Sequence, residues 1–246
     1  MTAMDNPSIR RILSDTSRSS FQKYKDLTVG ENGTGGFLVY ETSSALLGPI
    51  PGAIGIFLRQ KIYPRFFGRC GKGLVVGRNC TFRHPSKMSF GDNVTIDDNT
   101  LIDARGATGK GVVFGDGVII NRNSIVQSKN GDIWIGKSVS LGANGTVVSW
   151  SGIRIGDHAL IAGGCCISAG RFDFDDLDRN ITDQDGYSTG PIVIDENVWL
   201  ATRVTILDGV QIGRGSVISA GSVVTGNIPP WSVAHGNPAK AVYTRR

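Results

Sequence analysis

The amino-acid sequence predicts a mainly β protein whose chain winds as a parallel β-helix. A hydrophobic residue returns at every sixth position near the end of the chain, at Ile194, Leu200, Ile206, Ile212, Ile218 and Val224. Small or β-branched residues stand four places after most of these, at Val198, Val204, Val210, Ser216 and Ser222. Glycine is abundant, with 34 residues in 246, as a coil with three tight corners requires. Hexads are a known repeat of β-helices, so three of them should close one triangular coil, and coils should stack about 4.8 Å apart.

The same hydrophobic phase continues upstream in groups of three hexads. Its members are Val76 and Phe82, then Phe90, Ile96 and Ile102, then Phe114, Ile120 and Val126, then Ile135, Leu141 and Val147, then Ile155, Ile161 and Ile167. Within a group the step is six residues, and between groups it is 8, 12, 9, 8 and 27 residues, then finally 6. All extra residues therefore enter at one corner of the predicted prism. The largest insertion covers about 173–193, and we expect a binding site at such a loop.

The sequence divides into an N-terminal segment, 1–69, and a β-helix domain, 70–246, which carries the inserted loop 173–193. Residues 1–35 are polar and then glycine-rich, which predicts disorder or a short helix. The apolar run ALLGPIPGAIGIFL follows, interrupted by Pro49 and Pro51 and followed by Arg59, Lys61 and Arg65. It is too short to span a bilayer. Two interpretations remain open and are compatible: a helical cap over the first coil, or a peripheral membrane contact through residues 46–66.

Composition and charge exclude several classes of function. The net charge is +5 without a polybasic run, so no nucleic-acid partner is expected. Neither a secretory signal nor a membrane-spanning stretch is evident, which favours a cytoplasmic location, at the inner face of the membrane if the apolar segment binds lipid. The four cysteines form no CxxC motif, so we expect no metal. Cys80 and Cys165 occupy the small inward position of the hexad and should be buried.

The segment IDENVWLATRVTILDGVQIGRGSVISAGSVVTGNIPPWSVAHGNPAK combines the hexad phase, an ENVW motif after the inserted loop, an IPP turn and GNPAK, in that order. In these features residues 70–243 resemble the hexapeptide-repeat acyltransferases, which include galactoside and maltose acetyltransferases. The resemblance implies a left-handed β-helix, a homotrimer, and an acetyl-CoA or other acyl-CoA donor bound between subunits. It implies a sugar or glycan acceptor with a reactive hydroxyl or amine. The cofactor-binding residues that it implies are Trp199, Ala201, Ala220, Thr225, His235 and Lys240.

The resemblance also implies a histidine as general base, which would take the proton from the acceptor as it attacks the thioester. In this chain the matching position, in HALIAGGCCISAGRFDF, is Phe172. The candidates for the missing base are Asp173 and Asp175 of the acidic loop and His84 from a neighbouring subunit. The substrate's own chemistry is a further alternative. A second departure is Gly226-Asn227, where the family often has Lys-Asp.

Two functions therefore remain open at this stage. The leading hypothesis is a CoA-dependent O- or N-acyltransferase with an atypical site. The alternative is a non-catalytic trimeric β-helix that binds a ligand or partner, which the absence of the histidine favours. A zinc site like that of the carbonic-anhydrase branch of this fold is excluded, because the three histidines are 74 and 77 residues apart and fall on different coils.

Overall fold

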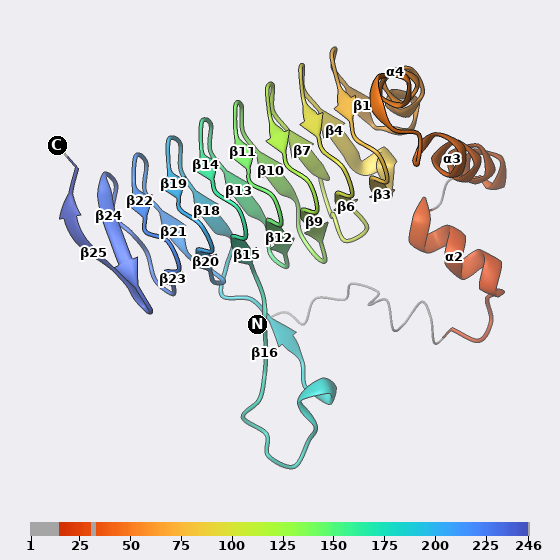
Figure 1. Ribbon diagram of the computed structural model, residues 1–246. Helices are drawn as coiled ribbons and strands as arrows, with labels where there is room; N and C mark the ends of the chain where they lie inside the picture. The colour runs from red at the N-terminus through yellow and green to blue at the C-terminus, as the bar shows by residue number, and fades with distance from the viewer. Residues whose placement is uncertain (1–14, 31–32, 246) are drawn as a thin grey trace.

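The computed structural model describes residues 15–30 and 33–245 and shows a three-sided parallel β-helix of seven coils (Figure 1). Face A comprises β1 (Arg69–Cys70), β4 (Met88–Phe90), β7 (Val112–Phe114), β10 (Ile133–Ile135), β13 (Ile153–Ile155), β18 (Ile192–Ile194) and β21 (Gln211–Ile212). Face B comprises β2 (Val75–Val76), β5 (Thr95–Ile96), β8 (Ile119–Ile120), β11 (Ser140–Leu141), β14 (Leu160–Ile161), β19 (Trp199–Leu200) and β22 (Val217–Ile218). Face C comprises β3 (Thr81–Arg83), β6 (Leu101–Asp103), β9 (Ile125–Ser128), β12 (Thr146–Ser149), β15 (Cys166–Ser168), β20 (Thr205–Ile206) and β23 (Val223–Val224).

The hydrophobic residues of the hexads form the interior of this prism. In face B the register places Val76 opposite Ile96 and Ile96 opposite Ile120, and all three side chains are fully buried. The small residues four places later also point inward, among them Val204 and Ser216. Because identical phases stack in every coil, the core is one continuous column, and the predicted β-helix is confirmed.

Two of the three corners in each coil are tight, and left-handed backbone geometry makes them so. Between faces B and C, Asn79, Asn99 and Asn123 have φ between 54° and 58°, a region in which asparagine is enriched. Their side-chain amides also bond along the stack, from Asn79 to Asn99 at 3.4 Å and from Asn99 to Asn123 at 3.3 Å. His158 has a φ of 58° at an equivalent corner between faces A and B and is exposed, as its place in the hexad predicts.

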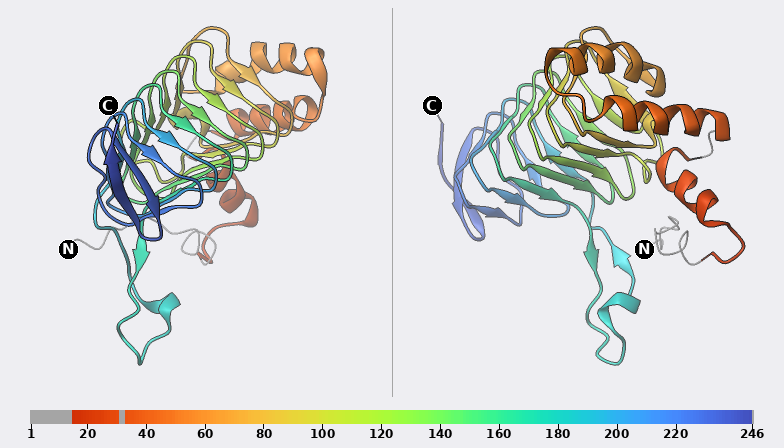
Figure 2. Two further views of the ribbon diagram at one scale, coloured as in Figure 1. Left: turned by 60° about the vertical axis from the view of Figure 1, so that its left-hand side comes forward. Right: turned by 45° about the vertical axis from the view of Figure 1, so that its right-hand side comes forward.

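The third corner, from face C to face A, takes the insertions. The longest one forms a small antiparallel hairpin, β16 (Arg171–Phe172) and β17 (Gly186–Tyr187), with a short 3-10 helix η3 (Ile181–Asp183) near its far end. Figure 2 shows that this loop stands out from the prism instead of lying along it. The predicted position of the insertion is therefore correct.

Helices cover the open end of the first coil, which has no preceding coil to pair with (Figures 1 and 2). These elements are α2 (Ser20–Thr28), α3 (Thr34–Leu47), α4 (Gly52–Ile62) and the 3-10 helix η1 (Tyr63–Phe66). A capping box between Ser19 and Gln22 begins α2. Arg59 Nε donates to the Val76 carbonyl at 2.9 Å, so a helical side chain satisfies a strand-edge group that would otherwise be buried and unpaired. The cap interpretation therefore describes this segment.

The opposite end of the prism is covered by an antiparallel hairpin of β24 (Ser232–Gly236) and β25 (Ala239–Thr244), which extends face B. β24 pairs with β22 in parallel, so it continues the stack as an eighth strand, and β25 then reverses direction. One further 3-10 helix, η2 (Pro85–Lys87), lies between the first two coils.

Candidate functional site

The inserted loop places Phe172 where the resemblance predicts a histidine. Phe172 lies on β16, half exposed, with its ring edge-on to the indole of Trp150 at a centroid distance of 5.8 Å. The described chain is exposed without interruption from Arg171 to Asp183. Asp173 and Asp175 fall in this exposed stretch, so within one subunit neither carboxylate faces a buried pocket. A base role for either residue would therefore need a substrate or a second subunit to contact the loop.

His84 lies at the far end of the same corner column, beside the helical cap. Its Nε2 is 2.7 Å from the Asp26 carbonyl, and its backbone N–H donates to the Thr28 carbonyl at 2.7 Å. Burial lowers the pKa of His84, more than the hydrogen bond with Asp26 raises it, so the ring is neutral at pH 7. The order of strands places β15, which precedes the loop, four coils beyond β3, which precedes His84. Within a subunit, the structure does not bring His84 together with the loop carboxylates, because it fixes this ring against α2.

The residues implied to bind the cofactor fall into separate groups. Ala201, Ala220 and His235 lie at the corner between faces B and C in the last coils, and Lys240 sits opposite His235 in the terminal hairpin. Thr225 follows β23 at the opposite edge of face C. His235 and Lys240 thus lie side by side and exposed at this corner, and their side chains are of the kinds that bind phosphate groups.

Trp199 projects from the middle of face B, where its indole is exposed. Tyr187 lies in the loop hairpin, and the loop leaves the prism at the corner opposite face B. Tyr187 and Trp199 therefore do not line one pocket within a single subunit, because the width of the coil separates them. The hexad phase predicts on which face of the prism each residue lies. Which residues of different faces lie close together is known only from the structure of the closed coil.

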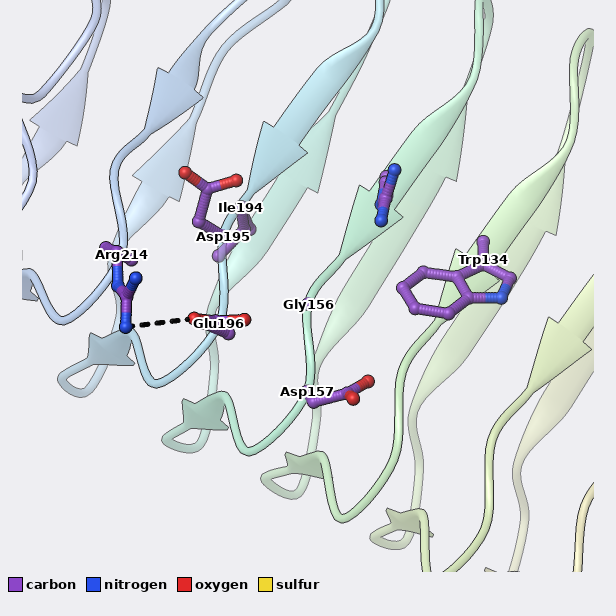
Figure 3. Close-up of a pocket in the computed structure, with 8 residues that line it drawn as sticks. Trp134, Gly156, Asp157, Ile194, Asp195, Glu196 and Arg214 are labelled. Carbon is purple, nitrogen blue, oxygen red and sulfur yellow. Dashed lines mark ion pairs between the residues drawn. The ribbon is translucent and has the colours of Figure 1, made fainter.

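A shallow pocket of about 300 Å³ lies on face A, away from all of the predicted site residues. Figure 3 shows Trp134, Asp157, Asp195 and Glu196 around it, with Arg214 forming an ion pair to Glu196 at 3.2 Å. In the six other coils the position of Asp195 is a glycine: Gly71, Gly91, Gly115, Gly136, Gly156 and Gly213. A Cβ at these glycines would lie within 2.3–2.7 Å of the next layer of chain, so Asp195 is the exception in a column that favours glycine.

Sequence reasoning missed Asp208 and Trp150, which hold the base of the inserted loop. The side chain of Asp208 is 1% exposed and accepts hydrogen bonds from both ends of the loop. Trp150 packs against Gly170 and Gly186, where an added Cβ would come within 2.8 Å of the Trp150 side chain. The only sequence signal was an Asp at the insertion corner in ILDGV, which is hard to distinguish from a solvated charge.

Across residues 15–30 and 33–245, no group of three or more metal-binding side chains gathers in a way that could hold an ion. In the same part of the chain, no helix is both long and apolar enough to cross a membrane. Burial raises the pKa of Cys80 to about 11 and also raises the pKa of Cys165. Cys165 is buried as expected, whereas Cys80 is only partly buried.

Two family models match the coils on either side of the inserted loop. Residues 191–226 match the bacterial transferase hexapeptide (six repeats), and residues 133–169 match the hexapeptide repeat of succinyl-transferase. Among solved structures, the N-acyltransferase AntD from Bacillus cereus, in complex with dTDP-4-amino-4,6-dideoxyglucose and coenzyme A, superposes with a TM-score of 0.56. It is 20% identical and covers 76% of this chain and 89% of its own, a level at which the likeness shows the fold.

Curated relatives also share sequence identity with this chain. A probable acetyltransferase of Mycobacterium tuberculosis is 35% identical over 133 residues, which are 54% of this chain and 44% of that protein. A putative acetyltransferase of Staphylococcus aureus is 58% identical over 59 residues, which are 24% of this chain and 30% of that protein. The matches span less than half of the length of these two relatives. With the family models and the coiled architecture, they show that the repeats of this chain are similar to the hexapeptide repeats of proteins named as acetyltransferases.

Proposed function

We propose that this protein is a CoA-dependent acyltransferase that moves an acetyl group from acetyl-CoA to a hydroxyl or amine of a sugar or glycan. The observation that carries the proposal is the transferase-type hexapeptide match at 191–226, which begins where the inserted loop returns to the prism. The relatives named as acetyltransferases support the reaction class, and the sugar-nucleotide and coenzyme A in the AntD complex suggest the acceptor class.

The test begins with binding and continues with turnover. Acetyl-CoA titrated into the protein by calorimetry should bind, and CoA release, followed with a thiol reagent, should depend on an added acceptor. Suitable probes are maltose, methyl β-galactoside and a dTDP-linked amino sugar. Variants with His235 and Lys240 each replaced by Ala should weaken acetyl-CoA binding if this corner holds the phosphates. The absence of acetyl-CoA binding by the wild-type protein would refute the proposal.

The general base is the part of the reaction that this chain supplies differently. General-base catalysis contributes about 10²–10⁴-fold. If Asp173 or Asp175 takes the proton, its change to Asn lowers kcat by about that factor and leaves acetyl-CoA binding intact. If neither does, both variants are silent, and Phe172→His should raise turnover because it restores an imidazole near neutral pKa.

A homotrimer would complete this site, because the loop and the C-terminal corner lie apart in one subunit. Face B offers a contact surface: Ile119, Leu160 and Trp199 project from it in a column and are exposed, Leu160 by 51%. Exposed apolar side chains in such a row are typical of subunit interfaces. Sedimentation should give three subunits, and Leu160→Asp should shift the protein toward monomer, whereas Arg154→Asp on face A should not.

A second candidate function is a non-catalytic trimeric β-helix that binds a ligand or partner. The observation that favours it is Phe172, an aromatic ring in the position that the resemblance assigns to the base. In that case acetyl-CoA does not turn over with any acceptor, and Phe172→His creates no activity even where the cofactor binds.

The location proposed is cytoplasmic, with the helical cap at the inner face of the membrane through residues 46–66. Leu46, Ile54 and Phe57 are exposed, Ile54 by 72%, and Lys61 lies over the Phe57 ring at 5.8 Å. Apolar side chains beside basic ones suit an anionic lipid surface. The wild-type protein should co-sediment with phosphatidylglycerol vesicles, and the double variant Ile54→Glu with Phe57→Glu should not. Equal behaviour of the two proteins would leave only the cap role.

A further inference from the structure

Both ends of the inserted loop are held by one buried carboxylate from the next coil. Asp208 lies between β20 and β21, at the same corner one coil further on, and its side chain is 1% exposed. Its Oδ1 accepts from the Gly170 N–H at 2.9 Å and from the Ser188 hydroxyl at 2.7 Å. Its Oδ2 accepts from the Thr189 N–H at 2.5 Å and from the Thr189 hydroxyl at 2.8 Å. The outgoing and the returning chain are thus tied to the same group.

The groups around Asp208 keep its carboxyl ionised and fully hydrogen-bonded. Burial raises the pKa of this carboxyl, but the hydrogen bonds from Thr189, Ser188 and Gly170 lower it by more, so the pKa lies below its ordinary value. The Arg171 guanidinium is 3.9 Å away and half exposed. A carboxylate with a depressed pKa and four donors is a poor proton acceptor at neutral pH, so Asp208 is unsuited to be the missing base.

Beyond this anchor, the loop touches the prism through little else. The Ser188 hydroxyl oxygen also lies 2.7 Å from the Ser151 hydroxyl oxygen, which in turn lies 2.8 Å from the Gly190 carbonyl oxygen. Trp150 supports the two strands of the hairpin at their glycines. From Arg171 to Asp183 the chain is exposed. The direction in which the loop stands is therefore set at its base.

We infer that Asp208 is the positioning residue of the inserted loop: its carboxylate joins the loop's two ends and so fixes the direction in which residues 171–187 project from the prism. That these residues serve acyl transfer rests on the proposed function, whereas the anchoring itself does not. The chain contains a matched control. Asp132 accepts backbone N–H groups from Thr108 to Gly111 at 2.6–3.2 Å and so closes a different insertion at the same type of corner.

The first experiment measures how often the loop opens. Trypsin can cut after Arg179, which is exposed at the far end of the loop. Asp208→Asn keeps the size of the side chain but turns one acceptor into a donor, which then faces either the Gly170 and Ser188 donors or the two donors of Thr189. Cleavage after Arg179 should then become about tenfold faster or more, because proteolysis of a local segment follows the population of its open form.

Three outcomes decide the anchoring. Faster cleavage in Asp208→Asn and wild-type cleavage in Asp132→Asn supports it. Unchanged cleavage in Asp208→Asn overturns it, and equally faster cleavage in both variants also overturns it, since the effect is then general loosening. Should Asp208→Asn fail to fold, Ser188→Ala removes one of the four hydrogen bonds and should give a smaller increase at the same bond.

The second experiment separates positioning from a general structural role. With maltose, methyl β-galactoside or the dTDP-linked amino sugar, whichever the wild-type protein acetylates, Asp208→Asn should raise the KM for the acceptor. The dissociation constant for acetyl-CoA, measured by calorimetry, should not change. Equal loss of acetyl-CoA binding would overturn the positioning role. If the wild-type protein acetylates none of the probes, the proposed function fails, and the cleavage rates still decide the anchoring.

Discussion

Replacement of Arg59 should detach the helical cap from the first coil. Arg59 is 1% exposed, and within the described residues it forms no ion pair with a carboxylate. Its Nε donates to the Val76 carbonyl, and its Nη1 donates to the carbonyls of Leu47 and Ile50 at 2.7 and 2.8 Å and lies 3.3 Å from that of Gly48. The Nε and Nη1 groups of Arg59 are therefore satisfied by backbone oxygens of the strand edge and the helix connection.

The magnitude follows from the oxygens left without donors. The Leu47 carbonyl also accepts the Ile50 N–H at 3.4 Å, and the Gly48 carbonyl accepts the Asn79 N–H at 2.9 Å. The Val76 and Ile50 carbonyls therefore depend most on Arg59. A buried acceptor that loses its partner costs about 1–3 kcal/mol, so Arg59→Met should lower the free energy of unfolding by about 2–6 kcal/mol.

The assay is urea unfolding followed by circular dichroism, together with hydrogen exchange of the first coil. Arg65→Met is the matched control, since Arg65 is a nearby exposed arginine of the same segment. We expect a lower midpoint and faster exchange in the first coil for Arg59→Met only. Equal midpoints for the two variants would refute the reasoning, because the buried guanidinium would then contribute no more than a solvated one.

Three further predictions concern the coil itself. Gly136→Ala should lower the melting temperature, with a cost of about 1–3 kcal/mol, because its Cβ would lie 2.8 Å from the Asp157 backbone nitrogen, whereas Asp195→Gly, which restores the column residue, should not. Hydrogen bonds from four backbone N–H groups lower the pKa of Asp132 below its ordinary 3.8 against the opposing effect of burial. The contribution of Asp132 to the free energy of unfolding should be complete well above pH 3.8 and should decrease as the pH falls through the lower pKa of the folded state. This decrease should be smaller in Asp132→Asn, as unfolding midpoints in urea at each pH would show. Burial raises the pKa of Cys80 to about 11, so iodoacetamide at pH 8 should label it only after unfolding, as mass spectrometry of the labelled peptide would show.

The hexad phase predicted the fold because burial acts on it directly. Ile120 and Leu141 are fully buried because every inward position of a closed coil lacks solvent, and each repeat confirms the phase of the others. The position of the insertion followed from the same count, since added residues can enter only where they do not shift the strands.

The candidate site was harder to predict, since its residues lie outside the repeat. Periodicity says nothing about whether a corner carboxylate such as Asp208 is solvated or buried, because that depends on chain that is distant in sequence. Tyr187 and Trp199 are close in sequence yet lie on opposite sides of the coil, so proximity along the chain does not place them in one pocket. Asp173 and Asp175 are exposed within one subunit, so a base role for either carboxylate stays a prediction.

The helical cap has a consequence for assembly. Without the helices, the first coil would present the unpaired edges of three strands, and exposed strand edges pair readily with other chains. The hairpin of β24 and β25 covers the last coil in face B, so both ends of the prism are covered. Variants that weaken the cap at Arg59 should therefore aggregate through the first coil before they unfold.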